Sequence, residues 1–95
     1  MSKSLEVKQI IKKIDKADRE IAAQRRNIRA EMSGVASWWK GNASKAFLDK
    51  YNEIDYGIAT LERRVDELRN NADRLRKLLE EEERESKLLA KKLKG

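Results

Sequence analysis

Apolar residues in the first third of the chain recur at steps that alternate between three and four. The series is Val7, Ile10, Ile14, Ala17, Ile21, Ile28 and Val35. Gln24 and Glu31 fill the two positions at which the series becomes polar. Because a helix has about 3.6 residues per turn, this spacing places the apolar residues on one face. The pattern predicts an amphipathic helix over residues of about 5–36, with Ser2 or Ser4 as its cap.

A second apolar series runs through the other half of the chain and keeps the same alternation without interruption. It is Phe47, Tyr51, Ile54, Ile58, Leu61, Val65, Leu68, Ala72, Leu75 and Leu79. The register then meets polar Glu82 and Ser86 before it recovers at Leu89 and Leu93. This heptad pattern predicts a longer helix over residues of about 43–92. We expect the acidic run 80–83 to mark the point where this helix passes its partner helix and enters solvent.

The segment between the two series, residues 32–42, reads MSGVASWWKGN and carries no heptad phase. It holds two of the four glycines, and Asn42 at its end is a suitable cap for the second helix. We therefore expect a turn at residues of about 37–42 and an antiparallel helix-turn-helix hairpin. One hairpin buries little apolar surface alone. The sequence thus predicts an all-α single domain, residues 1–95, that dimerises into a four-helix bundle.

The composition narrows the chemistry that the chain can perform. Its 95 residues include no cysteine, histidine or proline, which excludes disulfides, thiolate chemistry and Cys/His metal sites. Two thin helices offer no pocket with convergent polar groups, so we expect no catalytic, cofactor-binding or metal-binding residues and no enzyme activity. The run 80–83 is expected to be a solvated face, because adjacent side chains on a helix point in different directions.

The formal net charge of +6 raises the question of a polyanionic partner. The signs are interleaved, since residues 1–33 carry 9 basic and 5 acidic side chains and residues 34–69 carry 6 of each. This mixture favours a solvated helix surface over a specific nucleic-acid site. Binding of nucleic acid or an anionic membrane is the alternative function, and it rests on the net charge. The first residues, MSKSLEVKQIIKK, contain no apolar stretch long enough for a signal peptide or a transmembrane helix.

The turn segment carries the motif Trp39-Lys40-Gly41, which is followed by Phe47 and Tyr51. The stretch WWKGNASKAFLDKY, residues 38–51, resembles the turn and early second helix of the WXG family, the ESAT-like small helical hairpins exported by type VII secretion. The chain length, the central motif and the flanking heptads agree with this resemblance.

The resemblance implies that the protein pairs with a second helical hairpin. The partner is a second copy, another hairpin protein or the helical N-terminal domain of a larger effector, and the sequence leaves this choice open. The resemblance also implies that the type VII secretion ATPase reads the turn motif, for which the candidate residues are Trp38, Trp39 and Gly41. The predicted partner interface is Ile10, Ile14, Ile21, Ile28, Phe47, Tyr51, Ile54, Leu61, Val65 and Leu68.

The same resemblance implies a bacterial protein that is cytoplasmic and secreted without a cleavable signal peptide. It would be an exported substrate, or an escort of an effector used in virulence or interbacterial competition. One departure concerns the Tyr-x-x-x-Asp/Glu export signal that often follows the second helix in this family. The formal match here, Tyr51 to Asp55, lies directly after the turn, where Tyr51 is expected to be a core aromatic. We therefore expect the export signal to come from a partner. The basic net charge is also less usual for the family, and it would suit an acidic partner surface.

Overall fold

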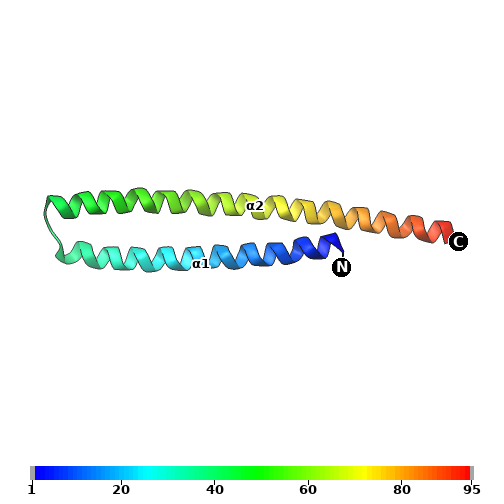
Figure 1. The fold of residues 1–95 in the computed structure, drawn as a ribbon, viewed down its shortest axis with the longest axis horizontal. Helices are drawn as coiled ribbons and strands as arrows, with labels where there is room; N and C mark the ends of the chain where they lie inside the picture. The colour runs from blue at the N-terminus through cyan, green and yellow to red at the C-terminus, as the bar shows by residue number, and fades with distance from the viewer. Residues whose placement is uncertain (1, 95) are drawn as a thin grey trace. The chain divides into compact units, whose positions relative to one another are not determined.

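The computed structural model describes residues 2–94, and over that range it contains two α-helices and no strand. Helix α1 spans Lys3–Trp38 and helix α2 spans Asn42–Lys94, so the second helix is the longer one. The chain reverses direction at residues 39–41 (Figure 1). The prediction of an all-α helical hairpin is therefore confirmed. The four-helix bundle and the single-domain assignment stay predictions.

The helix ends explain why the helices are longer, and the turn shorter, than the sequence pattern indicates. Ser2 caps α1, because its hydroxyl accepts a hydrogen bond from the Leu5 amide at 3.2 Å and its carbonyl accepts one from the Glu6 amide at 3.1 Å. At the start of α2 the Gly41 carbonyl accepts a hydrogen bond from the Lys45 amide at 3.1 Å. Asn42 is thus the first helical residue, and its assignment as the cap is wrong.

The chain divides into two compact units. The turn unit consists of residues 16–66, and the end unit consists of residues 2–15 together with residues 67–94. Each unit contains one segment of α1 and one segment of α2. None of the described helices is both long and apolar enough to cross a membrane.

In the turn unit the two helical segments face one another through half-buried residues that alternate between apolar and charged. On α1 these include Ile21, Arg25, Met32 and Val35, and on α2 they include Leu48, Tyr51, Asp55, Ile58, Glu62 and Val65. Every third or fourth residue of each helix therefore contributes, as in a heptad interface. The charged residues of this interface, Arg25, Asp55 and Glu62, were not among the interface residues that the apolar series predicted.

In the end unit the interface includes the apolar side chains that are most deeply buried in residues 2–94. Val7 and Ile11 keep 9% and 7% of their accessible surface. Burying an aliphatic side chain of this size contributes about 1.5–3 kcal/mol. The Ser4 side chain is also buried, at 5% exposure, and it lies against Glu83 of α2.

Candidate partner-binding face and turn motif

The turn is closed by an aromatic cluster that consists of Trp38, Trp39 and Phe47. The Trp39 ring lies 5.4 Å from the Phe47 ring at an interplanar angle of 49°, and it stacks on Trp38 at 6.5 Å and 24°. Trp39 is half-buried between its neighbours, whereas Trp38 is 71% exposed and Phe47 is 44% exposed. The motif tryptophan thus joins the two helices, while Trp38 is presented to solvent.

Gly41 is needed at the turn for its backbone conformation. Its φ angle is +110°, a region that residues with a side chain rarely adopt. A Cβ atom built at this position meets nothing within 4 Å, so packing sets no limit there. The turn is closed by Ser44, which is 3% exposed and whose hydroxyl donates a hydrogen bond to the Trp39 carbonyl at 2.7 Å. The Lys40 Nζ donates to the Ala36 carbonyl at 3.1 Å, which satisfies one of the free carbonyls at the end of α1.

The apolar series on α2 separates into two rows, each with a spacing of seven residues. The inner row, Tyr51, Ile58, Val65, Ala72 and Leu79, is half-buried against α1. The outer row, Phe47, Ile54, Leu61, Leu68 and Leu75, is 44%, 61%, 49%, 57% and 48% exposed. The hairpin therefore covers only half of the apolar stripe that the sequence lays down along this helix.

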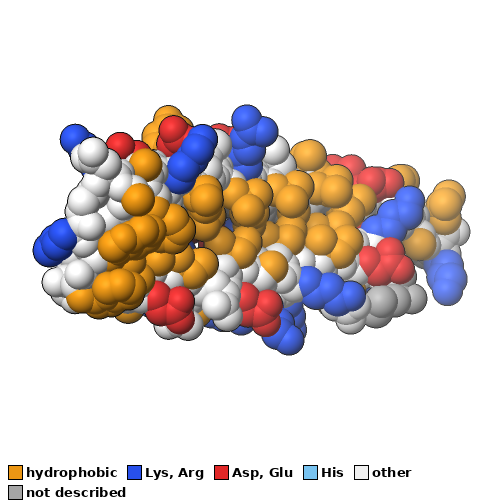
Figure 2. Space-filling model, turned by 60° about the vertical axis from the view of Figure 1, so that its left-hand side comes forward, with side chains coloured by type: hydrophobic (Ala, Val, Ile, Leu, Met, Phe, Trp, Pro, Cys, Tyr) orange, Lys and Arg blue, Asp and Glu red, His pale blue; other side chains and the backbone are white. Residues whose placement is uncertain are grey.

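The predicted interface residues of α1 divide in the same way. Ile14 and Ile21 are half-buried, while Ile10 and Ile28 are 52% and 37% exposed. Each unit thus has exposed apolar side chains that a partner could cover: Ile28 and the outer row up to Leu61 in the turn unit, and Ile10, Leu68 and Leu75 in the end unit. In Figure 2 hydrophobic side chains gather on the face that is turned toward the viewer, and charged side chains border them. Whether these residues contact a partner stays a prediction.

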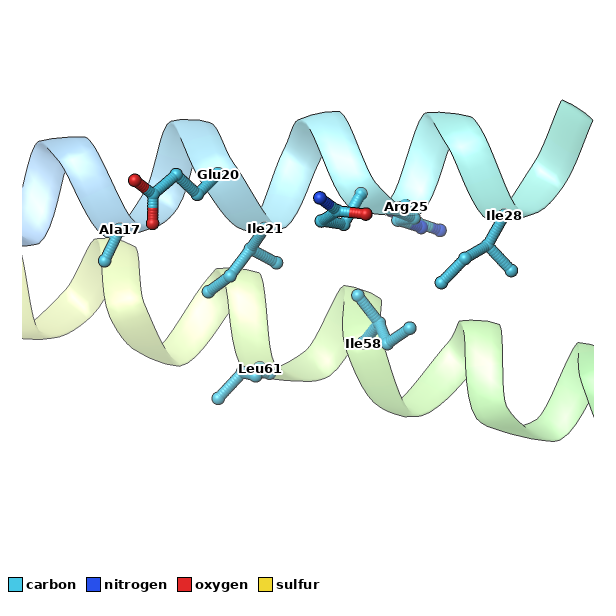
Figure 3. A pocket seen from close by; sticks show the side chains of 8 residues that line it. Ala17, Glu20, Ile21, Arg25, Ile28, Ile58 and Leu61 are labelled. Carbon is cyan, nitrogen blue, oxygen red and sulfur yellow. The ribbon is translucent and has the colours of Figure 1, made fainter.

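A groove of about 480 Å³ lies on the outer side of the turn unit. Figure 3 shows how side chains from both helices line it. The lining residues are Ala17, Glu20, Ile21, Gln24, Arg25, Ile28, Ile58 and Leu61. Five of these eight side chains are aliphatic, and the other three are one carboxylate, one amide and one guanidinium. The groove suits an apolar side chain or a helix flank, and it lacks the convergent polar groups that a catalytic pocket needs.

An ion network joins the two helices of the turn unit. Arg25 donates to Asp55 through Nε at 2.8 Å and through an Nη at 3.0 Å, and its other Nη lies 3.3 Å from Glu62. Arg29 adds a hydrogen bond to Asp55 at 2.9 Å. The hydrogen bond from Arg25, followed by that from Arg29, holds the pKa of Asp55 well below its ordinary value. The bond to Asp55 likewise raises the pKa of both arginines.

The end unit has its own polar contacts between helices. Glu83 accepts hydrogen bonds from the Ser4 amide at 3.2 Å and from the Ser4 hydroxyl at 2.7 Å, and these bonds lower the pKa of Glu83. Lys8 lies 3.2 Å from Glu80 and lowers the pKa of that carboxyl. The interpretation of the whole run 80–83 as solvated is therefore wrong, because two of its four carboxylates bind the start of α1. The residues of α2 after Glu83, from Arg84 to Lys94, are all exposed.

Sequence reasoning did not identify the charged residues that connect the helices. Asp55, Glu62 and Arg69 follow one another at intervals of seven on α2, and Arg69 pairs with Asp15 at 3.0 Å. This period was visible in the sequence as a polar heptad row beside the apolar one. Among the described residues, no group of three or more acidic side chains is placed to hold a metal ion.

The formal export pattern from Tyr51 to Asp55 lies inside the hairpin interface. The Tyr51 hydroxyl is buried and makes no hydrogen bond within the described residues, and Asp55 is bound by two arginines. Neither side chain is presented as a linear signal would need to be.

A family model described as "Proteins of 100 residues with WXG" matches residues 3–84, which is most of the chain. The matched range includes both helices of the turn unit and the aromatic turn, and it ends just after Glu83. No curated protein and no solved structure matches the chain.

Proposed function

The chain belongs to the WXG100 family, and we propose that it is a non-enzymatic protein that acts by pairing its exposed apolar face with another helical hairpin. Membership implies a small protein associated with type VII secretion, a system that secretes proteins of this family.

The observation that carries the proposal is the exposure of the outer row on α2. In the turn unit, Phe47, Ile54 and Leu61 lie on one flank of the helix at 44–61% exposure, while Asp55 on the other flank binds α1. Scattered exposed apolar residues are ordinary, but a row with heptad spacing is the pattern by which helices pair. A second hairpin on this face would complete a four-helix bundle.

The partner in this proposal is a second copy of the chain or the helical N-terminal domain of an effector. Because Tyr51 and Asp55 are held inside the hairpin, a signal of the Tyr-x-x-x-Asp type would have to come from the partner. This favours the role of an escort that is exported together with a larger protein. The protein would then be found in the bacterial cytoplasm and, after export, outside the cell.

An export assay tests the pairing face. We would compare the protein in culture supernatants of a host with and without its type VII ATPase, for the wild type, Leu61→Glu and Asn52→Glu. Both substitutions add one negative charge to an exposed position of α2, but only Leu61 belongs to the outer row. We expect ATPase-dependent export of the wild type and of Asn52→Glu, and loss of export for Leu61→Glu with helix content unchanged. Export of Leu61→Glu at the wild-type level would contradict the proposed face.

The two tryptophans at the turn provide a matched test of the recognition motif. Trp39→Ala and Trp38→Ala each remove one indole from the aromatic cluster, and only Trp39 belongs to the Trp-x-Gly motif. We expect Trp39→Ala to reduce export more than its loss of stability explains, and Trp38→Ala to leave folding unchanged because that ring is 71% exposed. If export of Trp39→Ala falls only in proportion to its folded fraction, the motif has a structural role alone.

A further inference from the structure

In the turn unit, the charged side chains of α1 lie on different sides of the helix. Gln24 lines the groove, Arg25 binds Asp55 of α2, and Arg26 comes next in the chain. Because successive residues are about 100° apart on a helix, Arg26 lies on the side away from the groove. Arg19 precedes Arg26 by seven residues and therefore shares its side to within about 20°. Both arginines are exposed.

Lys16 and Arg29 flank these two arginines on the same side of α1, and we call the four residues the basic ridge. The positions between them on this side carry small side chains: Ala22, Ala23, Ala30 and Ser33. Of the three acidic residues of this α1 segment, Glu20 lines the groove, Asp18 is half-buried, and Glu31 lies about 140° around the helix from Arg26. Asp15, four residues before Arg19, is the neighbouring carboxylate of α1, and it pairs with Arg69 of α2 at 3.0 Å.

Most of this charge is not neutralised within the described part of the chain. Arg29 shares Asp55 with Arg25, and this cluster also contains Glu62, so two cations there meet two anions. No ion pair in residues 2–94 joins Lys16, Arg19 or Arg26 to a carboxylate. Three cations thus remain available to an external anion.

We propose that the basic ridge binds the phosphate headgroups of an anionic phospholipid surface. Guanidinium groups pair with phosphate through two parallel hydrogen bonds, and cationic side chains are attracted to anionic lipid. Arg19 and Arg26 share one side of α1, so both can contact a planar surface at once, and the small residues around them allow close approach. This inference concerns the side of α1 opposite the groove, so it does not depend on the proposed pairing face.

Tyr56 supports a membrane surface as the occupant. It follows Asp55, the residue of α2 that faces α1, just as Arg26 follows Arg25 on α1. In an antiparallel pair of helices, residues that follow the facing position on each helix lie on the same side of the pair. Tyr56 is 71% exposed, and a tyrosine ring suits the headgroup region of a bilayer. A single-stranded nucleic acid would instead need a groove and several stacking rings, whereas the turn-unit groove lies on the other side.

Vesicle co-sedimentation of the full chain tests the proposal. The probes are vesicles of phosphatidylcholine with 30% phosphatidylglycerol, a proportion at which surface charge attracts basic side chains strongly, and vesicles of phosphatidylcholine alone. The test variant is Arg19→Gln/Arg26→Gln. The matched control is Lys50→Gln/Arg64→Gln, which removes two exposed cations from α2 outside the ridge. A 20-base-pair DNA duplex, enough for about two helical turns, serves as a competing polyanion.

We expect wild-type protein to bind the anionic vesicles at low salt and not the neutral ones. Each charge that touches the surface changes affinity about fivefold, so Arg19→Gln/Arg26→Gln should weaken binding roughly thirtyfold and the control only a few-fold. Equal losses for both variants would show that net charge alone acts, and would overturn the proposal. Absence of vesicle binding by the wild type would overturn it too. Tighter binding to the duplex than to vesicles of equal phosphate concentration, lost in Arg19→Gln/Arg26→Gln, would assign the ridge to nucleic acid instead.

Discussion

In the end unit the first turns of α1 bury Val7 and Ile11 to 9% and 7% exposure, whereas in the turn unit the corresponding positions hold half-buried Ile21 and the charged Arg25. The end unit thus gains more from apolar burial between its own two segments. The turn unit relies on the ion network around Asp55 and on the aromatic cluster, and it leaves Ile54 and Leu61 exposed.

This difference shows how one hairpin can be fixed in register and still keep an apolar face for a partner. Ion pairs are directional, so a charged row can specify which residues of two helices face each other. Apolar burial is non-directional and is available to any surface of suitable shape. In the turn unit the two tasks fall to different flanks of α2, which is why its apolar heptad is only half used within the chain.

The largest effect that separates the two kinds of surface is expected at neighbouring isoleucines of the end unit. Ile11→Ala should lower the free energy of unfolding by about 2–3 kcal/mol, because it removes buried methyl groups from the interface. Ile10→Ala removes the same atoms from a side chain that is 52% exposed, so it should change the free energy of unfolding by less than about 0.5 kcal/mol. Urea unfolding at low protein concentration measures both. Equal losses would mean that the end unit has no distinct core, and a loss for Ile10→Ala that grows with concentration would place Ile10 in a partner interface.

The next effect distinguishes the turn from the helices that it joins. Gly41→Ala should destabilise the protein by about 1–3 kcal/mol, because φ of +110° is strained for a residue with a Cβ atom. Gly34→Ala should stabilise it by about 0.5–1 kcal/mol, since Gly34 is inside α1 with open space around a built Cβ. Thermal unfolding followed by circular dichroism gives both signs. Two changes of the same sign would contradict the backbone argument.

A smaller effect is expected from the buried hydroxyl that ties the turn together. Ser44→Ala should cost about 1 kcal/mol, because the Trp39 carbonyl loses its hydrogen bond in a site where Ser44 is 3% exposed. Ser37→Ala is the control, since the Ser37 hydroxyl also donates to a carbonyl, that of Gly34, but in an exposed position. Its stability should stay within about 0.5 kcal/mol of the wild type. If Ser37→Ala proves as costly as Ser44→Ala, burial is not what gives the Ser44 bond its value.

The smallest effect concerns the ion network, because partly exposed ion pairs are screened by solvent. The folded-state pKa of Asp55 lies below its ordinary value of 3.8. The unfolded state therefore binds the proton more readily, and the stabilisation is complete well above pH 3.8 and is lost as the pH falls below it. Below pH 3.8 we therefore expect the melting temperature of the wild type to decrease. The melting temperature of Asp55→Asn should be lower than that of the wild type at neutral pH and should decrease less steeply on acidification. Glu53→Gln, which changes an exposed carboxylate, should follow the wild-type curve. If the melting temperature of Asp55→Asn runs parallel to that of the wild type against pH, the Asp55 carboxylate does not fix the register of the two helices.

The helical periodicity of the sequence was sufficient to predict two helices, the reversal between them and the residues that could form an apolar face. Ile14, Ile21, Ile28 and Leu61 all belong to series whose spacing follows from the geometry of any α-helix. The turn motif with Gly41 was likewise readable, because a glycine beside a tryptophan between two heptad segments marks a chain reversal. The helix ends were less certain, since caps such as Ser2 and Gly41 depend on hydrogen bonds that compete within a few residues.

Local periodicity did not reveal which flank of the apolar stripe on α2 faces α1. Asp55 and Leu61 lie on opposite flanks of the same inner row, and either flank could have faced α1. The tertiary structure decided in favour of Asp55, because Arg25 and Arg29 of α1 bind it, whereas Leu61 lines the open groove and stays 49% exposed. The net charge of each sequence segment also does not show that Arg26 and Glu20 lie on different sides of α1. Their separation follows from their positions around the helix axis. The sequence by itself determined the helices and their faces, since these depend on spacing along one chain segment. Only the tertiary structure decided which face is used internally and which stays open, because that choice depends on pairs of residues far apart in the chain.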